Sequence, residues 1–139
     1  MTMTVAEALS ALLGEGPLLS GDPCAYLADE TETRNLVGSC DAVVIPRTVE
    51  QVAAVVRSAY ANDIALVPRG GVTGYAGGAV PVDGGIVVTL ERLDRVRQLD
   101  PLLWRVHVDP GAAGQSHLGG NIATNAGGPH TFKYSTTGA

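Results

Sequence analysis

Apolar residues recur with helical spacing near the start of the chain, in TVAEALSALLG. One face of the expected helix would carry Val5, Leu9 and Leu12 or Leu13. Thr4 and Glu7 have the spacing of a capping box, in which each side chain satisfies a free N–H at the helix start. Gly14 suits the helix end. The pattern predicts an amphipathic helix here, whereas residues 15–41 are irregular and turn-rich and predict no defined element.

Two short apolar runs flank a second amphipathic segment. AVVI (42–45) and IALV (64–67) predict buried strands, and TVEQVAAVVRSAYAND between them predicts a helix. Thr48 and Gln51 repeat the capping-box spacing. The apolar stripe of this helix is Val52, Val55, Val56 and Ala59. Because a strand, a helix and a strand follow within about 25 residues, they form a βαβ unit whose strands we expect to be parallel.

Three further strands are predicted downstream. GGIVVTL (84–90) is apolar and predicts a third buried strand, and residues 96–99 and 103–108 predict a hairpin around DPLL. After Asp109 the periodicity is lost, and the residues that follow have the composition of loops.

The stretch VPRGGVTGYAGGAV, residues 67–80, holds five glycines and no acid, base or nucleophile. Glycine makes up 18 of 139 residues, about 13% against a typical share of about 7%. Peptide units without Cβ atoms can direct several N–H groups at one anion, and Thr73 and Arg69 would add a hydroxyl and a cation. The loop follows the second predicted βαβ strand, where α/β sheets commonly bind ligands. A phosphate-binding loop is therefore predicted, with a long structural turn as the alternative.

Two familiar nucleotide motifs are absent from this stretch. No GxxxxGK[ST] sequence is present, which excludes a P-loop, and the glycine spacing fits no register of GxGxxG. A second cluster, LGGNIATNAGG (118–128), surrounds Asn121, Thr124 and Asn125 with paired glycines. Neutral amides and hydroxyls suit the edge of a polar heterocycle, although an Asn-Gly turn is the simpler alternative. Two such segments in one small chain favour a shared ligand.

Charge and composition narrow the class of protein and the partners to be expected. The 139 residues fit one domain or two small lobes, and the net charge of −5 disfavours nucleic acid as a partner. Without a basic leader or a long apolar run, a cytoplasmic protein is expected, in the cytosol or at the membrane periphery. The spacing of Cys24 and Cys40 predicts ordinary thiols of unassigned role. Asp22, Asp29, Glu30 and Glu32 would form a solvated acidic loop.

The histidines match no metal spacing, so no metal site is expected. His107 alternates with the apolar face of a strand and is expected at the surface, whereas His117 and His130 border the second glycine cluster and suit structural or polar-contact roles. Trp104 and Phe132 are isolated aromatics that we expect in the core.

Long stretches of the chain resemble a known family. DAVVIPRTVEQVAAVVRSAYANDIALVPRGG, VPRGGVTGYAGGAVPVDGGIVVTLERLDRV and DPGAAGQSHLGGNIATNAGGPHTFKYSTTGA are similar to the FAD-binding (PCMH-type) domain of the vanillyl-alcohol-oxidase-type flavoproteins. The resemblance is greatest to the branch of the glycolate oxidase flavoprotein subunit and D-lactate dehydrogenase. It covers roughly residues 40–139.

This resemblance implies an α+β fold of two lobes with FAD between them. Residues 1–105 would form the N-terminal lobe and 106–139 part of the second. The residues implied at the diphosphate are Pro68, Arg69, Gly70, Gly71, Val72, Thr73 and Gly74, with Gly77 and Gly78 continuing the wall. Those implied near the flavin and ribityl chain are Pro110, Gly111, Gly119, Gly120, Asn121, Thr124, Asn125 and Gly127. Covalent relatives often carry His where this chain has Val72, so non-covalent FAD is expected.

The resemblance also implies an activity and two departures from the family pattern. The whole enzyme would oxidise a 2-hydroxy acid to a 2-oxo acid, passing electrons to an acceptor or partner subunit. Relatives carry a further segment between the strand ending at Val108 and Asp109, and they continue past TTGA into a cap domain with the substrate-binding and catalytic groups. No catalytic base can therefore be named in this chain. The alternatives are a non-catalytic nucleotide- or phosphate-binding module and a structural domain.

Overall fold

The structure is a computed structural model that describes residues 4–14, 17–19, 23–29, 35–103, 105–112 and 117–125. Its centre is a four-stranded sheet in the order β1-β2-β4-β3. These strands are β1 (Leu18–Leu19), β2 (Ala42–Val44), β3 (Leu66–Arg69) and β4 (Ile86–Thr89). The helices are α1 (Val5–Leu13), α2 (Val49–Ala61), α3 (Leu118–Ala123) and a short 3-10 helix, η1 (Pro23–Tyr26). A separate hairpin pairs β5 (Val96–Asp100) with β6 (Arg105–Val108).

The predicted βαβ unit is present, but its two strands are not neighbours. β2 and β3 are both parallel to β4, which lies between them with Val87 opposite both Val43 and Val67. All four residues of β4 are buried, as expected for a central strand. Pro68 has no N–H to donate and is tolerated at a sheet edge, which is where β3 lies.

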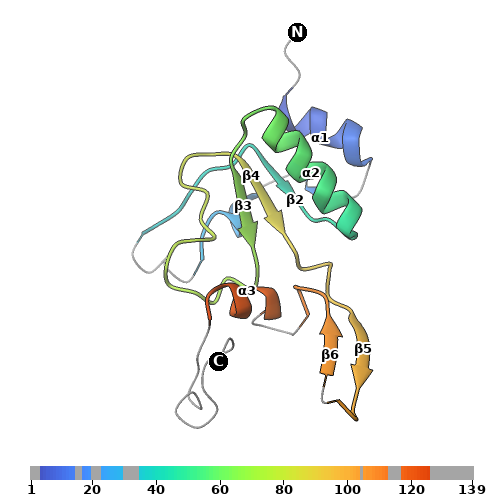
Figure 1. Cartoon of the computed structure of the whole chain (residues 1–139). Helices are drawn as coiled ribbons and strands as arrows, with labels where there is room; N and C mark the ends of the chain where they lie inside the picture. Colours follow the sequence, from blue (N-terminus) through green and yellow to red (C-terminus); the bar gives the residue numbers. More distant parts are fainter. Residues whose placement is uncertain are drawn as a thin grey trace.

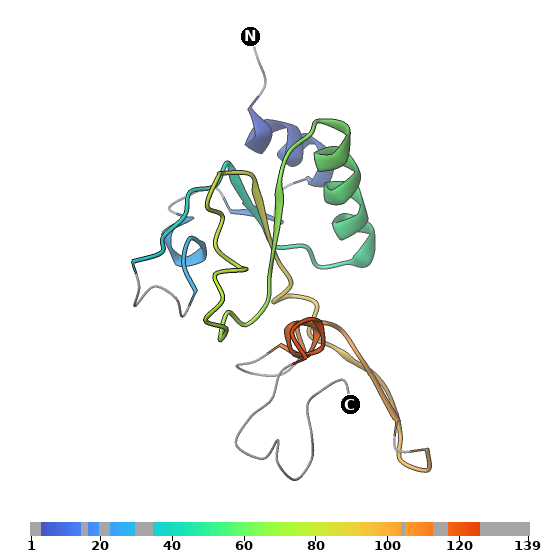
Figure 2. The same ribbon diagram turned by 60° about the vertical axis from the view of Figure 1, so that its left-hand side comes forward.

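Helices α1 and α2 lie together on one face of the sheet, where their apolar stripes build the core (Figures 1 and 2). The buried core cluster consists of Leu9, Ala42, Val44, Val55, Ala59, Ile86 and Val88. Burying a Val, Leu or Ile side chain stabilises a fold by about 1.5–3 kcal/mol, so this cluster is a major source of stability. The predicted stripes are confirmed at their centres, whereas Leu12 and Val56 lie exposed at the margins.

Both predicted helix starts are confirmed, with one difference in detail. At α1 the capping box is complete, since Thr4 N–H donates to Glu7 Oε2 at 2.7 Å and Glu7 N–H donates to Thr4 Oγ1 at 3.2 Å. At α2 Thr48 accepts from Gln51 N–H, but the Gln51 side-chain oxygen accepts from Arg47 N–H instead of Thr48 N–H. The cap therefore extends one residue further back than the spacing predicts.

The hairpin prediction is confirmed, and the prediction that the segment after Asp109 is mostly loop is wrong for residues 118–123. Residues Leu118–Ala123 form the short helix α3, with Asn121 N–H donating to His117 O and Thr124 N–H to Gly120 O. Two glycines and the absence of any buried residue explain why no apolar period revealed it. No helix in the described ranges is long and apolar enough to cross a bilayer.

Candidate functional site

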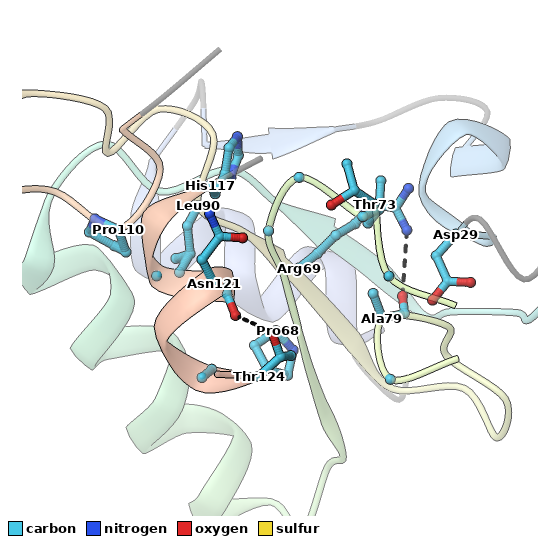
Figure 3. Close-up of a pocket in the computed structure, with 18 of the residues that line it drawn as sticks. Asp29, Pro68, Arg69, Thr73, Ala79, Leu90, Pro110, His117, Asn121 and Thr124 are labelled. Carbon is cyan, nitrogen blue, oxygen red and sulfur yellow. Dashed lines mark hydrogen bonds between the residues drawn. The ribbon is translucent and has the colours of Figure 1, made fainter. Parts of the chain in front are cut away.

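A cleft of about 820 Å³ opens where β3 ends, between the glycine-rich loop and α3. The loop leaves β3 at Arg69 and α3 lies beyond the same, carboxyl end of the parallel strands (Figures 1 and 2). Figure 3 shows Arg69 and Thr73 from the loop side, and His117, Asn121 and Thr124 from the α3 side. Segments separated by some 40 residues in sequence therefore line opposite sides of one cleft.

Most of the predicted site residues lie in the lining of this cleft. They are Pro68, Arg69, Gly70, Gly71, Val72, Thr73, Gly74, Gly78, Pro110, Gly119, Gly120, Asn121 and Thr124. Gly77, Gly111 and Asn125 are not among the lining residues, and Gly127 lies outside the described residues. The prediction that two glycine segments face a common space is thus supported by their placement, while the role of each residue toward a ligand stays a prediction.

Six lining residues are not among the site residues that the sequence predicts: Asp29, Ala76, Ala79, Leu90, His117 and Ala123. The alanines and Leu90 gave no chemical signal. For His117 a structural or polar-contact role beside the second cluster is predicted but no cofactor contact, although its position directly before LGG could have marked it. Trp104, Phe132 and His130, for which core or contact roles were expected, lie outside the described residues. His107 is exposed on β6, as predicted.

The loop offers hydrogen-bond donors to the cleft. Among main-chain hydrogen bonds within the described residues, none is donated by an N–H of residues 70–74. Main-chain donors that find no protein acceptor must be satisfied by water or by a ligand. Residues 70–74 all line the cleft, so their donors are available to a bound anion.

Arg69 lies in the cleft wall but directs its guanidinium into the protein. The residue is 6% exposed. Its Nη1 donates to Tyr26 O at 3.2 Å, Ala28 O at 2.7 Å and Ala79 O at 3.4 Å, and its Nη2 donates to Ala25 O at 3.0 Å. The side chain therefore ties the segment around η1 to the far end of the glycine loop (Figure 3). The guanidinium already donates to main-chain carbonyls, and its predicted contact with a phosphate stays a prediction.

Asp29 does not belong to a solvated acidic loop, and that expectation is wrong for this residue. It is 6% exposed and lines the cleft near Arg69. Burial lowers the pKa of the Arg69 guanidinium, and the negative charge of Asp29 opposes that change. Buried charges require partners, and the negative charge of Asp29 therefore favours the buried guanidinium, whose direct hydrogen-bond partners are main-chain carbonyls.

Val72 adopts an unusual backbone conformation within the loop. Its φ is +52°, in the left-handed region that a β-branched residue rarely enters. Asn125, at the end of α3, has a φ of +49°, and asparagine tolerates this region well. Strain of this kind costs about 1–3 kcal/mol and persists where the surroundings or the function require it.

A glycine-lined cleft at the carboxyl edge of parallel strands in an α+β fold is the architecture of a domain that binds a nucleotide cofactor. The sequence family described as FAD binding domain matches residues 40–116, which is more than half of the chain. The chain belongs to this FAD-binding domain family, and FAD is its cofactor.

Three known proteins illustrate the relationship. D-2-hydroxyglutarate dehydrogenase of Xanthomonas citri pv. viticola is 40% identical over an alignment that covers 69% of this chain and 25% of the relative. Glycolate oxidase subunit GlcD of Escherichia coli K12 is 32% identical, with 68% of this chain and 23% of the relative covered. The structure of p-cresol methylhydroxylase with substrate bound superposes with a TM-score of 0.64 at 26% identity, covering 75% of this chain and 21% of that one.

The chain spans about a quarter of the length of these curated relatives. The Xanthomonas alignment runs over 118 positions, whereas 69% of this 139-residue chain is about 96 residues, so about 22 aligned positions have no counterpart here. The hairpin continues past Val108, because Asp109 N–H donates to Arg95 O and Gly111 N–H donates to Leu93 O, both at 2.8 Å. β6 ends at Val108, and main-chain hydrogen bonds to the preceding segment continue across the point where a missing segment was expected. Residues 113–116, a little further along, lie outside the described residues.

Proposed function

We propose that this chain is the FAD-binding portion of a flavin-dependent 2-hydroxy-acid dehydrogenase or oxidase of the glycolate or D-lactate type. The observation that carries the proposal is that residues 70–74, whose main-chain N–H groups donate no main-chain hydrogen bond within the described residues, line one cleft together with α3. The chain's residues 40–116 also match the FAD-binding family. When bound, FAD supplies the electron acceptor for oxidation of the substrate's α-carbon. Relatives named for 2-hydroxy-acid oxidation support the substrate class.

The residues of the cleft fit a flavin dinucleotide. A diphosphate carries two negative charges and many acceptor oxygens, and charge-assisted hydrogen bonds from N–H donors are each worth about 1.5–3 kcal/mol. Residues 70–74 would supply these donors, with the Thr73 hydroxyl beside them. Beta-carbons built on Gly74, Gly78 and Gly120 would meet no heavy atom within 4 Å, so these glycines leave room beside the main chain for a ligand.

The opposite wall would contact the other parts of the cofactor. Pro110, Gly119, Gly120, Asn121 and Thr124 line that side and offer apolar surface, amide groups and a hydroxyl, which suit a flavin and its ribityl chain. Three predicted cofactor contacts, Gly77, Gly111 and Asn125, do not line the cleft, and Gly127 lies outside the described residues. Their contact with FAD would require parts of the cofactor to lie outside the described lining. Val72 cannot form a covalent bond to the flavin, so FAD would be bound non-covalently.

The same proposal assigns cofactor binding and substrate binding to different parts of the enzyme. Residues 1–105 would form one lobe and 106–139 the beginning of another, with the substrate-binding groups on polypeptide beyond this chain. The chain would hold and orient the cofactor and exclude water from one side of it. The substrate, the electron acceptor and any partner subunit would be selected elsewhere.

The test measures FAD binding directly. The full 139-residue chain is titrated into FAD, and flavin fluorescence and absorbance near about 450 nm, the region where free flavins absorb, report the complex. We expect saturable one-to-one binding, complete release of flavin on acid precipitation, and no turnover of glycolate, D-lactate or D-2-hydroxyglutarate by this chain alone. Failure to bind FAD would contradict the proposal. ADP binding without FAD binding would favour a nucleotide- or phosphate-binding module instead.

A further inference from the structure

His117 is the residue of the cleft whose chemistry the proposed function leaves unexplained. It stands immediately before α3 and lines the cleft together with the glycine loop. Its Nδ1 is shielded from solvent and has no hydrogen-bond partner among the residues that the structure describes. Although His117 occupies the cap position of α3, its side chain makes no capping hydrogen bond.

The nitrogen lies beside the start of the glycine loop. A Cβ built on Gly70 would lie 3.7 Å from the Cβ of His117 and 3.9 Å from its Nδ1. The imidazole ring therefore lies beside Gly70, the first residue after Arg69, and both residues line the cleft. A ligand group that accepts from the main-chain N–H of Gly70 would lie close to this imidazole.

A buried imidazole nitrogen without a partner is unfavourable, because it has lost its bonds to water and gained none in return. Nδ1 of His117 is thus an unsatisfied hydrogen-bonding atom, within the described residues, at the place where a ligand is expected to present acceptor oxygens. A phosphate ester offers only acceptors at neutral pH, so it pairs with a histidine that carries its proton on Nδ1.

We propose that Nδ1 of His117 donates a hydrogen bond to a phosphate oxygen of the dinucleotide that the glycine loop holds. This inference rests on the proposed function, since it assumes that FAD enters this cleft. It makes His117 a cofactor-binding residue from the α3 side, and the diphosphate is then held between main-chain donors of one segment and a side-chain donor of the other.

Substitutions test the contact through the dissociation constant of FAD, measured by fluorescence in the full chain. His117→Leu removes the donor and should weaken FAD binding about tenfold or more. His117→Asn places an amide nitrogen near the position of Nδ1 and should recover most of the affinity, whereas His107→Leu on the exposed face of the hairpin should leave it unchanged. Equal affinities in wild type and His117→Leu, or an Asn variant as weak as the Leu variant, would overturn the proposal.

Nuclear magnetic resonance of the wild-type chain gives an answer that does not depend on how the variants fold. In ¹⁵N-histidine-labelled protein, the Nδ1 resonance of His117 should shift on addition of FAD or saturating ADP, while that of His107 should not. A shift with riboflavin but not with ADP would assign the contact to the flavin and overturn the phosphate assignment. If the wild type binds no FAD, both the proposed function and this inference fail. If FAD binds and the His117 resonance does not shift, this inference alone fails.

Discussion

The glycines of the loop at residues 70–78 and those at positions 111 and 119 serve opposite physical purposes. In the first segment, Gly74 has no heavy atom within 4 Å of the position of a Cβ. By contrast, a Cβ on Gly119 would lie 2.7 Å from Pro110 Cβ, and one on Gly111, which precedes the second segment, would lie 2.1 Å from the carbonyl oxygen of Leu90. The open glycines, Gly120 of α3 among them, leave space beside the chain, whereas the packed glycines allow main-chain segments to lie close together.

This difference separates ligand binding from folding. A side chain at an open glycine would occupy the cleft and compete with a ligand, leaving the protein interior undisturbed. A side chain at a packed glycine would push two segments apart, and interiors at native density tolerate such overpacking badly. Glycine-rich composition alone does not reveal which of these effects operates.

The largest expected effect comes from Gly111→Ala, which should lower the free energy of unfolding by about 3 kcal/mol because the methyl group meets main-chain atoms that cannot rotate away. Urea unfolding without FAD measures the change. Gly74→Ala is the matched control and should alter stability by no more than about 0.5 kcal/mol. Similar losses in both variants would erase the distinction between packed and open glycines.

Gly71→Asp tests the other side of the comparison. An added carboxylate in the cleft lining would repel the diphosphate and fill its space, so FAD affinity should fall about a hundredfold, equivalent to about 2.7 kcal/mol. Fluorescence titration measures this loss. Gln98→Glu adds the same charge on the exposed hairpin and should bind FAD as the wild type does. Normal flavin content in the Gly71→Asp variant would contradict the assignment of the loop.

Val72→Asn sharpens the contrast between Val72 and Asn125, the non-glycine residues with a positive φ in the described parts of these two segments. Asparagine accepts the left-handed conformation more readily than valine, so the variant should be more stable than the wild type by about 1 kcal/mol. Val82→Asn, at an exposed valine that is not among the positive-φ residues, is the control and should give no gain. A loss of stability in Val72→Asn would show that the valine side chain contributes packing that outweighs its strain.

The smallest effect concerns the acid that precedes the second segment. The hydrogen bond from Arg97 Nε to Asp109 Oδ1 lowers the pKa of this carboxyl below its usual range, and a main-chain bond from Arg95 acts in the same direction. Its contribution to stability is therefore complete above about pH 4, near the unfolded value, and is lost as the pH falls through the lower folded value. The Asp109→Asn variant should therefore lose less stability than the wild type as the pH is lowered below the unfolded value. Thermal melts over a pH series measure the effect, and an equal fall in melting temperature for both proteins would contradict it.

Much of the N-terminal fold could be predicted because its signals are local. The capping pairs at Thr4 and Thr48 and the apolar stripes of α1 and α2 depend on residues within one helix, and the sequence alone located both helices. The order of the strands could not be predicted, since the insertion of β4 between β2 and β3 depends on which apolar strand is most deeply buried. The helix α3 was missed because glycines at 119 and 120 conceal any apolar period.

The amino-acid sequence by itself determined that two glycine-rich segments follow a βαβ unit, and that the first suits a phosphate and the second a polar heterocycle, because backbone freedom and polar side chains are properties of the residues. Only the tertiary structure decided which glycines are open and which are packed, that Arg69 bonds four carbonyls, and that His117 lies beside Gly70 with an unsatisfied nitrogen. Those properties depend on the distance between segments that are far apart in the chain, and no local pattern encodes that distance.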